Sequence, residues 1–360
     1  MRMRSGRTRR ETGVVVLSVL LVIAYSRVAL AQDRLVLQRL EIVSYGALDS
    51  GGNTDRPSIA VRSDGLVRIA ITDFEGGCCP LVAPLKVATR LGDDQWTYLI
   101  VTNYGDHPVP HFVPTGELGV LYMDYSGSTL RFAQVGETAA TIEDVQQVPG
   151  NPAGFVHFAP WDVRSDGEIQ AVVLFFDLRL RRTSSGWTSA VSPGTPQDIL
   201  LGPGQTVLIL GAQGLYSFPN GDLSQAGSLV LVPGGVPCCG NLVLDSSGEP
   251  NISYVSNGSL IYGVLTKHGW KLETVSSNIG GMLNDSALLV DTKGRPYVIY
   301  QNASNHVVIA AKKGSKWHES IDLGQGISGN MVFGPSDEID ATFTSTTDGL
   351  VRYARILISH

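Results

Sequence analysis

The sequence predicts an all-β fold built from repeated units of short strands. The 360 residues include 41 Gly and 18 Pro but carry little charge, and this composition favours strands and turns over helices. One unit also recurs: a short apolar strand, a small turn that ends in Gly, a second alternating strand and then a Trp. Its two clearest copies span Asn241 to Val275 and Ala287 to Ile321.

The turn glycine of this unit recurs at intervals typical of propeller blades. Successive copies are 51, 51, 37, 44 and 46 residues apart, and a period of about 40 to 50 residues with several short strands per unit indicates blades. The 329 residues after residue 31 accommodate about seven such units. We therefore expect a single seven-bladed β-propeller of four-stranded antiparallel blades over residues 32–360. The glycines are Gly65, Gly116, Gly167, Gly204, Gly248 and Gly294, of which Gly116 and Gly204 belong to weaker copies.

The N-terminal segment has the three regions of an export signal. Five arginines between Arg2 and Arg10 precede the apolar run from Val14 to Tyr25, and Ala29 and Ala31 form a small-residue cleavage motif. The apolar run is 12 residues long, shorter than the roughly 20 residues of a membrane-spanning helix. We expect residues 1–31 to be a signal peptide and the protein to be secreted or periplasmic, without a membrane span.

The two ends of the remaining chain complement each other. The last unit, Asn330 to Ile356, supplies three strands and lacks its outermost one. The run from Arg34 to Val43 is strand-like and belongs to no other unit, so it can complete the last blade and close the propeller. The alternative is an unstructured N-terminus, against which the alternating apolar pattern argues.

The charge of the chain argues against nucleic acid as a partner. The whole chain carries a formal charge of −6, and removal of six Arg and one Glu with residues 1–31 leaves −11. A chain this acidic without clustered Lys or Arg binds nucleic acid poorly. The one basic cluster comprises Arg179, Arg181 and Arg182, which we interpret as a solvated strand edge.

The four cysteines occur as two adjacent pairs. Exported proteins normally oxidise their thiols, and neighbouring Cα atoms are about 3.8 Å apart, just below the usual range for a disulfide. Because the pairs fall in different predicted blades, we expect a strained vicinal disulfide in each. A cross-bridge between the pairs and a thiolate metal site are the alternatives, and the metal site lacks CxxC spacing. The pairs are Cys78 with Cys79 and Cys238 with Cys239.

Strand alternation predicts a ligand site in the central funnel. It places the loops of both Cys pairs on one face of the propeller. The residues nine positions before or eight positions after each turn glycine then ring the funnel on that face, and many of them are polar or aromatic. This mixture suits a polar ligand such as a sugar, because carboxylates accept hydrogen bonds from hydroxyls and rings stack on sugar faces. The alternative is that Asp73 and Asp124 only cap turns and that Arg56 pairs with Asp55 or Asp73. The expected ligand-binding residues are Arg56, Asp73, His107, Asp124, Phe158, Asp285 and Asn302.

Histidine and tryptophan positions favour packing over metal binding. His107 and His111 are four residues apart, but the prolines between them exclude a helix, and in an extended strand the two positions are about 13 Å apart. No metal site is predicted from them, and a bound Ca²⁺ stays open. Five tryptophans are expected to pack within or between blades rather than to contact a sugar: Trp96, Trp161, Trp187, Trp270 and Trp317.

The two clearest units share a fuller pattern. In the first copy it comprises Leu244, Asp245, Gly248, Pro250, Ile252, Tyr254, Leu260, Tyr262 and Trp270, and in the second Val290, Asp291, Gly294, Pro296, Val298, Tyr300 and Trp317. This pattern resembles the repeat of secreted bacterial β-propeller proteins, which are related in shape to sialidase-like (BNR-type) propellers. The resemblance covers the whole chain loosely and these two units closely. It implies a fold and no particular activity.

The comparison with sialidases extends to one further motif. Arg56 and Pro57 resemble the Arg and Pro that begin the first blade of those enzymes, where the Arg holds the substrate carboxylate. The chain has no complete SxDxGxxW turn, and no other Arg stands at a predicted funnel position. Retaining sialidase chemistry is therefore not expected.

Two functions from different classes follow from these patterns. The favoured one is non-catalytic binding of a carbohydrate or another cell-surface ligand by a monomeric propeller without a cofactor. The alternative is a sialidase-like glycoside hydrolase that uses Asp73, Glu75 or Asp124 as acid and nucleophile. Catalysis by paired carboxylates needs a separation of about 5 to 9.5 Å, which the sequence alone does not establish.

Overall fold

The computed structural model describes residues 34–44, 57–73, 84–124, 126, 128–148, 159–174, 176–221, 227–277, 279–280 and 286–359. Within these residues the chain is almost entirely β, with two short 3₁₀ helices, η1 (Pro203–Gln205) and η2 (Pro219–Gly221). The predicted all-β class is confirmed. No helix of the described chain is both long and apolar enough to cross a membrane. The predicted signal peptide lies outside the described residues.

Five sheets contain four antiparallel strands each, in which neighbours in the sequence are neighbours in the sheet. The first two comprise β2 (Ser58–Val61), β3 (Val67–Thr72), β4 (Leu85–Gly92) and β5 (Gln95–Thr102), then β6 (Gly105–Phe112), β7 (Leu118–Asp124), β8 (Thr129–Val135) and β9 (Ala140–Gln147). The next two comprise β10 (Trp161–Val163), β11 (Ile169–Val173), β12 (Leu178–Thr183) and β13 (Gly186–Val191), then β14 (Pro196–Leu201), β15 (Val207–Gly211), β16 (Gly214–Phe218) and β17 (Ser228–Leu231). The fifth comprises β18 (Cys238–Leu244), β19 (Pro250–Ser256), β20 (Ser259–Thr266) and β21 (Gly269–Ser276).

The remaining strands form one seven-stranded sheet in the order β1-β27-β26-β25-β24-β23-β22. Its long strand β25 pairs with β24 as far as Gln325 and with β26 from Gly326 onward. The segment predicted as the N-terminal strand is present as β1 and pairs antiparallel with β27. The strands are β1 (Arg34–Ser44), β22 (Ala287–Val290), β23 (Pro296–Gln301), β24 (His306–Lys313), β25 (Lys316–Phe333), β26 (Ile339–Ser345) and β27 (Val351–Ser359).

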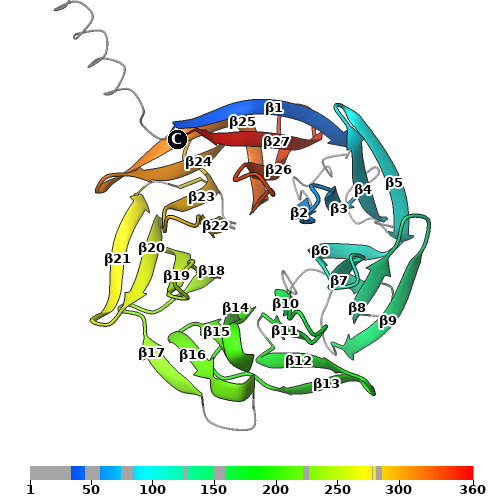
Figure 1. The fold of residues 1–360 in the computed structure, drawn as a ribbon, viewed down its shortest axis with the longest axis horizontal. Helices are drawn as coiled ribbons and strands as arrows, with labels where there is room; N and C mark the ends of the chain where they lie inside the picture. The colour runs from blue at the N-terminus through cyan, green and yellow to red at the C-terminus, as the bar shows by residue number, and fades with distance from the viewer. Residues whose placement is uncertain are drawn as a thin grey trace, which may run out of the picture.

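The sheets radiate around a central axis, which is the arrangement of a β-propeller (Figure 1). Strands β2, β6, β10, β14, β18 and β22 lie nearest the axis, and β5, β9, β13, β17 and β21 lie at the rim. The second strand of a sheet is covered on both sides, so every residue of β3, β7, β11, β15 and β26 is buried. Rim strands such as β13 carry mostly exposed side chains, because only one of their faces meets a neighbour.

Aromatic side chains join neighbouring sheets near the rim. Trp96 of β5 lies edge-on to Tyr353 of β27, with ring centroids 5.6 Å apart. Trp317 of β25 contacts Tyr262 of β20 in the same way, at 5.3 Å. The ring of Trp187 is 5.8 Å from that of Phe132, and Trp270 packs in the cluster between β15 and β19. These four tryptophans confirm the predicted packing role.

The recurring turn depends on its glycine. Gly65, Gly167 and Gly248 have φ values of +89°, +89° and +83°, a region in which residues with a side chain are strained. In the clearest copy, the carboxylate of Asp245 accepts backbone N–H groups of Ser247 and Glu249, both at 2.9 Å. Aspartate three residues before glycine therefore closes the turn, which explains the spacing in the repeat.

The prediction that the basic cluster is a solvated strand edge is wrong for Arg179. Arg179 on β12 is only 2% exposed and stacks over the ring of Phe218 in the next sheet, 5.3 Å from its centroid. Burial lowers the pKa of Arg179 to about 10. Because β12 is an interior strand of its sheet, Arg179 packs between sheets, where the sequence predicted a solvated edge.

A buried carboxylate connects β1 with the β2–β5 sheet. Glu41 is 2% exposed and accepts hydrogen bonds from Arg90 Nη2 at 2.7 Å and from Trp96 Nε1 at 3.1 Å. Arg90 lies on β4 and Trp96 on β5, so the N-terminal strand is held by side chains of the adjacent sheet as well as by β27.

We expect Glu41→Ala to lower the free energy of unfolding by about 3 kcal/mol, because it removes the buried partner of the Arg90 guanidinium, which is 14% exposed and keeps only the exposed Asp93. Chemical denaturation measures this loss. The control is Glu143→Ala, which removes a 2.9 Å pair with Arg182 in which each side chain is about one third exposed, and which should cost less than about 1 kcal/mol. Equal losses for the two variants would contradict the assignment.

Candidate functional site: the central cavity

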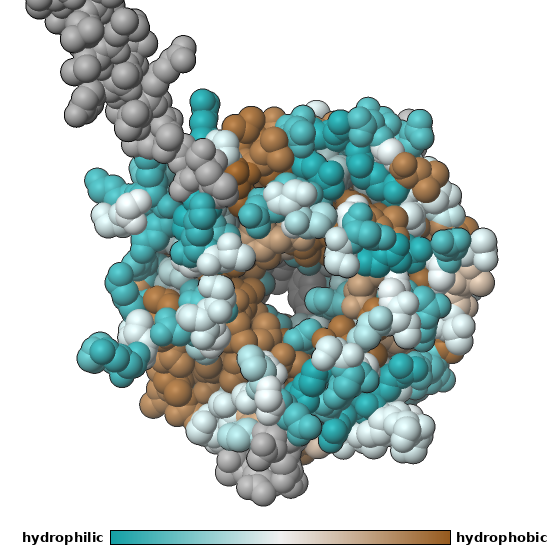
Figure 2. Space-filling view, viewed as in Figure 1, coloured by the Kyte–Doolittle hydropathy of each residue, from teal (hydrophilic) through white to brown (hydrophobic). Residues whose placement is uncertain are grey.

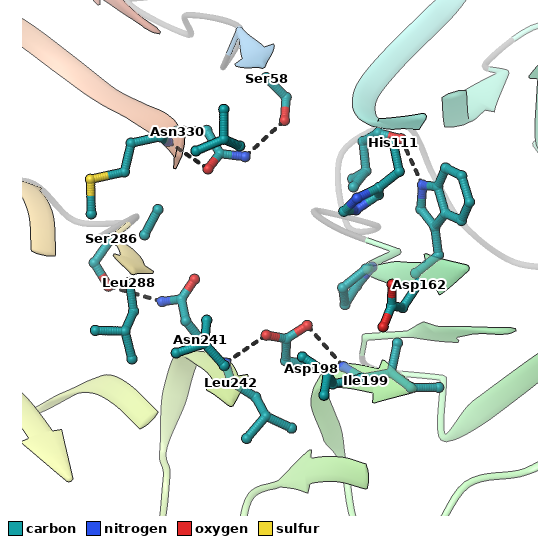
Figure 3. A pocket seen from close by; sticks show the side chains of 18 of the residues that line it. Ser58, His111, Asp162, Asp198, Ile199, Asn241, Leu242, Ser286, Leu288 and Asn330 are labelled. Carbon is teal, nitrogen blue, oxygen red and sulfur yellow. Dashed lines mark hydrogen bonds between the residues drawn. The ribbon is translucent and has the colours of Figure 1, made fainter. Parts of the chain in front are cut away.

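A cavity of about 400 Å³ lies on the axis and is enclosed by the innermost strands. Figure 2 shows the face of the disc hollowed at its centre, with hydrophobic side chains on part of the wall. Most of the wall is apolar, and polar groups enter it at a few places (Figure 3). The apolar part includes Ile59, Val109, Pro110, Pro160, Trp161, Leu174, Ile199, Leu242, Leu288, Leu289, Met331 and Val332.

Irregularities in the inner strands bring polar side chains to this wall. The pairing register shifts in β6, β14, β18 and β25, in each case near the end that enters the cavity. A bulge re-aims the side chain that follows it, and Asp198, Asn241 and Asn330 each follow such a shift. In β25 the bulge needs glycine, since a Cβ on Gly329 would lie 1.4 Å from the carbonyl oxygen of Thr342.

Two aspartates use their carboxylates to connect consecutive inner strands. Asp162 Oδ2 accepts the backbone N–H of Leu201 at 2.7 Å, and Asp198 Oδ2 accepts the backbone N–H of Leu242 at 2.7 Å. The other oxygen of each accepts the N–H of the following residue in its own strand, at 2.7 and 2.8 Å. Both oxygens of both carboxylates are therefore engaged by the backbone.

Two asparagines make equivalent connections. Asn241 Nδ2 donates to Ser286 Oγ at 3.1 Å, and Asn330 Nδ2 donates to Ser58 Oγ at 3.0 Å (Figure 3). The second of these links β25 with β2, across the join between the last and first parts of the described chain. We refer to the four residues Asp162, Asp198, Asn241 and Asn330 as the hub bridge.

The electrostatics of the wall are set by burial. Burial raises the pKa of Asp198 to about 7, although the two backbone N–H groups that it accepts favour the ionised form. Burial also lowers the pKa of His111, while the nearby Asp162 opposes this shift. The His111 ring packs edge-on against Trp161, with centroids 4.8 Å apart, and Trp161 Nε1 donates to the carbonyl of Val109 at 2.7 Å.

Two of the residues selected from the sequence reach this cavity. His107 lines it, with a φ of +50° and its ring Nδ1 2.8 Å from Asp106 Oδ2. Cys239 also lines it, is disulfide-bonded, and donates its backbone N–H to Gln197 Oε1 at 2.9 Å. The vicinal pairing of the cysteines stays a prediction, because Cys78, Cys79 and the side chain of Cys238 lie outside the described part.

Asp73 and Asp124 are not among the residues that line the cavity. They are 2% and 1% exposed, and each pairs with a cation on the next strand of its own sheet, Lys86 and Arg131 respectively. Asp124 Oδ1 also accepts the backbone N–H of Ser126 at 2.8 Å. For Asp124 this local arrangement is the turn-capping alternative considered from the sequence. A ligand-binding role for either carboxylate stays a prediction.

Asn302 also lies apart from the cavity lining. Its Oδ1 accepts backbone N–H groups of Ser304 and His306, at 3.0 and 3.2 Å, and its Nδ2 donates to Glu319 at 3.2 Å. It therefore holds the turn between β23 and β24. The remaining residues selected from the sequence lie outside the described part of the chain: Arg56, Glu75, Phe158 and Asp285.

Sequence reasoning weighed His111 only as a metal ligand, and it did not select the hub bridge. A fixed offset from the turn glycine was the signal used, but Asp162, Asp198 and Asn241 stand five, six and seven positions before their glycines. Bulges and unequal turns change the offset from sheet to sheet. A search for Asp or Asn within a window before each turn finds these three residues.

Solved structures of similar fold are β-propellers. A streptogramin B lyase superposes with a TM-score of 0.61 at 12% identity, over 89% of this chain and 98% of that one. Virginiamycin B lyase from Staphylococcus aureus gives 0.57 at 11% identity, over 91% and 100%. The WD40 propeller domain of Doa1 gives 0.53 at 13% identity, over 89% and 96%. At these identities the likeness shows the propeller fold alone. No protein-family model and no curated protein sequence matches the chain.

The raised pKa of Asp198 predicts a pH-dependent stability. Because the folded pKa of about 7 exceeds the usual value of 3.8 for Asp, the stabilising contribution of this group is complete below about pH 4 and is lost as the pH rises through about 7. We expect Asp198→Asn to abolish this decrease, whose upper limit is about 4 kcal/mol for a shift of this size. Denaturation at about pH 4.5, 6 and 8 measures it.

A surface substitution provides the matched control. Asp64→Asn removes a carboxylate whose pKa the Arg62 guanidinium lowers to about 2, so its titration lies below the window tested. Its stability relative to the unmodified protein should not change between about pH 4.5 and 8. If Asp198→Asn also leaves the pH profile unchanged, burial does not perturb Asp198 as described.

Proposed function

We propose that the protein is a non-catalytic binding protein that holds a compact, predominantly apolar ligand in its central cavity. The observation that carries the proposal is a cavity of about 400 Å³ with a mainly apolar wall and a few polar groups. Small-molecule sites typically have this size and composition. The identity of the ligand is left open, and the features of the wall define its class.

The polar groups of the wall support binding over catalysis. A general acid or base needs an atom free to reach the substrate, whereas both oxygens of Asp162 and of Asp198 accept backbone N–H groups. Asn241 donates to the hydroxyl of Ser286, which directly precedes β22, and Asn330 donates to that of Ser58 on β2. These groups hold the cavity in shape, and their remaining lone pairs and N–H groups can orient a ligand.

The wall favours a ligand less hydroxylated than an oligosaccharide. A sugar site uses exposed aromatic faces as platforms, but Trp161 is 2% exposed and packs between His111 and Phe132. Aliphatic side chains and prolines supply the surface instead. The cavity thus favours a compact apolar molecule over the carbohydrate expected from the sequence.

We also infer a seven-bladed, closed architecture. The seven-stranded sheet divides naturally at β25, whose two halves pair with different neighbours, into β22–β25 and the set β25, β26, β27 and β1. With the five four-stranded sheets this makes seven units of four strands. Pairing of β1 with β27 supports closure by the N-terminal strand, which removes an open sheet edge. Export through the predicted signal peptide accords with an extracellular or periplasmic site of action.

The glycoside hydrolase alternative has weaker support. Its candidate carboxylates Asp73 and Asp124 pair with Lys86 and Arg131 and are nearly inaccessible. Hydrolysis of chromogenic glycosides tests this alternative directly. Turnover that Asp73→Asn and Asp124→Asn abolish would establish it.

A larger side chain in the cavity wall should weaken ligand binding. We expect indole or camphor, which are compact and mainly apolar, to bind with a negative heat-capacity change in calorimetry, because apolar surface is buried. Leu289→Trp enlarges a partly buried side chain of the wall and should weaken binding at least about tenfold by excluding the ligand.

The matched control is Leu357→Trp, which makes the same change at a residue that is 40% exposed and does not line the cavity. It should leave affinity unchanged. Equal weakening by both variants, or no binding by any compact apolar probe, would contradict the proposal.

A further inference from the structure

A second groove lies away from the central cavity and shares no lining residue with it. It has a volume of about 770 Å³ and is formed where the start of β1 and the end of β27 meet β23, β24 and β25. Its wall includes five basic side chains and no Asp or Glu among the described residues. The basic residues are Arg34, Arg295, Lys312, Lys313 and His318.

This concentration of positive charge is unexpected on an acidic chain. The protein carries a formal charge of −6, and −11 without residues 1–31. Basic residues scattered evenly over such a surface would mostly lie beside carboxylates. Their gathering in a single groove creates a local potential opposite in sign to that of the molecule, which attracts anions specifically to this place.

Only part of this charge is neutralised nearby. Arg295 Nε lies 2.6 Å from Asp291 Oδ2, and Lys312 Nζ lies 2.6 Å from Glu273 Oε2. These pairs fix two cations in the wall. Arg34 and Lys313 are exposed and have no carboxylate partner within the described chain, so two positive charges remain in excess.

We propose that this basic groove binds a short acidic saccharide, either sulfated or carboxylated. Its volume exceeds what one inorganic anion fills, and its basic side chains come from β1, β24, β25 and the turn before β23, so it fits a ligand with several anionic groups. Ile358, which is partly exposed, adds apolar surface to the wall for the carbon face of a sugar ring. Lys and Arg side chains bind sulfate and carboxylate oxygens through charge-assisted hydrogen bonds.

The groove fits nucleic acid less well. Binding of single strands relies on exposed aromatic rings on which bases stack, but Tyr297, the groove's one Trp, Tyr or Phe among the described residues, is 3% exposed and bonds Asp291 through its hydroxyl. The acidic remainder of the molecule would also repel a phosphate backbone that extends beyond the groove.

An anionic membrane is disfavoured by the shape and chemistry of the site. Membrane-binding surfaces present apolar side chains that enter the bilayer beside their basic residues. Within the groove Leu35 is only 7% exposed and Pro296 is buried, so most of the apolar part of the wall is recessed, while Ile358 is partly exposed. A short, flexible anionic chain can enter the groove, whereas a flat lipid surface can reach only its rim.

Charge reversal tests the proposal on the full protein. The probe is a heparin-derived tetrasaccharide, with neutral cellotetraose as its uncharged counterpart, and binding is measured by calorimetry at low and physiological salt. We expect the sulfated probe to bind, salt to weaken it, and the double variant Arg34→Glu, Lys313→Glu to lower its affinity at least about tenfold. Arg34→Gln with Lys313→Gln should give a smaller loss and keeps the test valid if reversal prevents folding.

Matched controls distinguish a specific site from general charge effects. Lys267→Glu changes the net charge at an exposed turn outside the groove and should alter affinity less than about twofold. Loss of binding in the groove variants with apolar-probe binding intact separates this site from the central cavity. The proposal is overturned if Lys267→Glu acts as strongly as the groove variants, if the tetrasaccharide does not bind, or if single-stranded DNA or phosphatidylglycerol vesicles bind more tightly.

Discussion

The structure depends on hydrogen bonds that join successive inner strands at the axis. Radiating sheets touch along their broad faces through apolar packing, which has no direction and allows sheets to slide. The hub bridge removes this freedom, because each of its side chains accepts from or donates to a defined group on the next strand, as Asp198 does with the N–H of Leu242. At the four junctions that these residues span, relative position is thereby set by directional contacts, while the sheets supply most of the buried area.

The same constraint limits the chemistry of the cavity. Carboxylates at the centre of a propeller are well placed for catalysis, but here the oxygens of Asp162 and Asp198 are occupied by backbone N–H groups. Burial of His111 disfavours its charged form. The result is a mainly apolar cavity, in which the polar groups position the strands of the wall. Two exposed cations without a carboxylate partner in the described chain, Arg34 and Lys313, lie elsewhere, in the basic groove beside β1.

Much of the fold could be predicted from the sequence because its determinants are local. The turn glycines, Gly248 among them, have positive φ values, which is why glycine recurs at this position of the repeat. Asp245 closes its turn by hydrogen bonds within five residues. Alternation and spacing therefore located the strands, including β1. Trp96 and Trp317 pack between sheets as predicted, since a large ring at the start of a rim strand can reach only the neighbouring sheet.

The site could be predicted only in part, because it is made of contacts between units. By itself the sequence determined the strands, the turns and the presence of a hub, and it selected His107 and Cys239 at its wall. Only the tertiary structure decided that Asp73 pairs within its own sheet and that Asp198 reaches the next one. A bulge of one residue turns a side chain to the other face of a strand, and bulges leave no fixed spacing in the sequence.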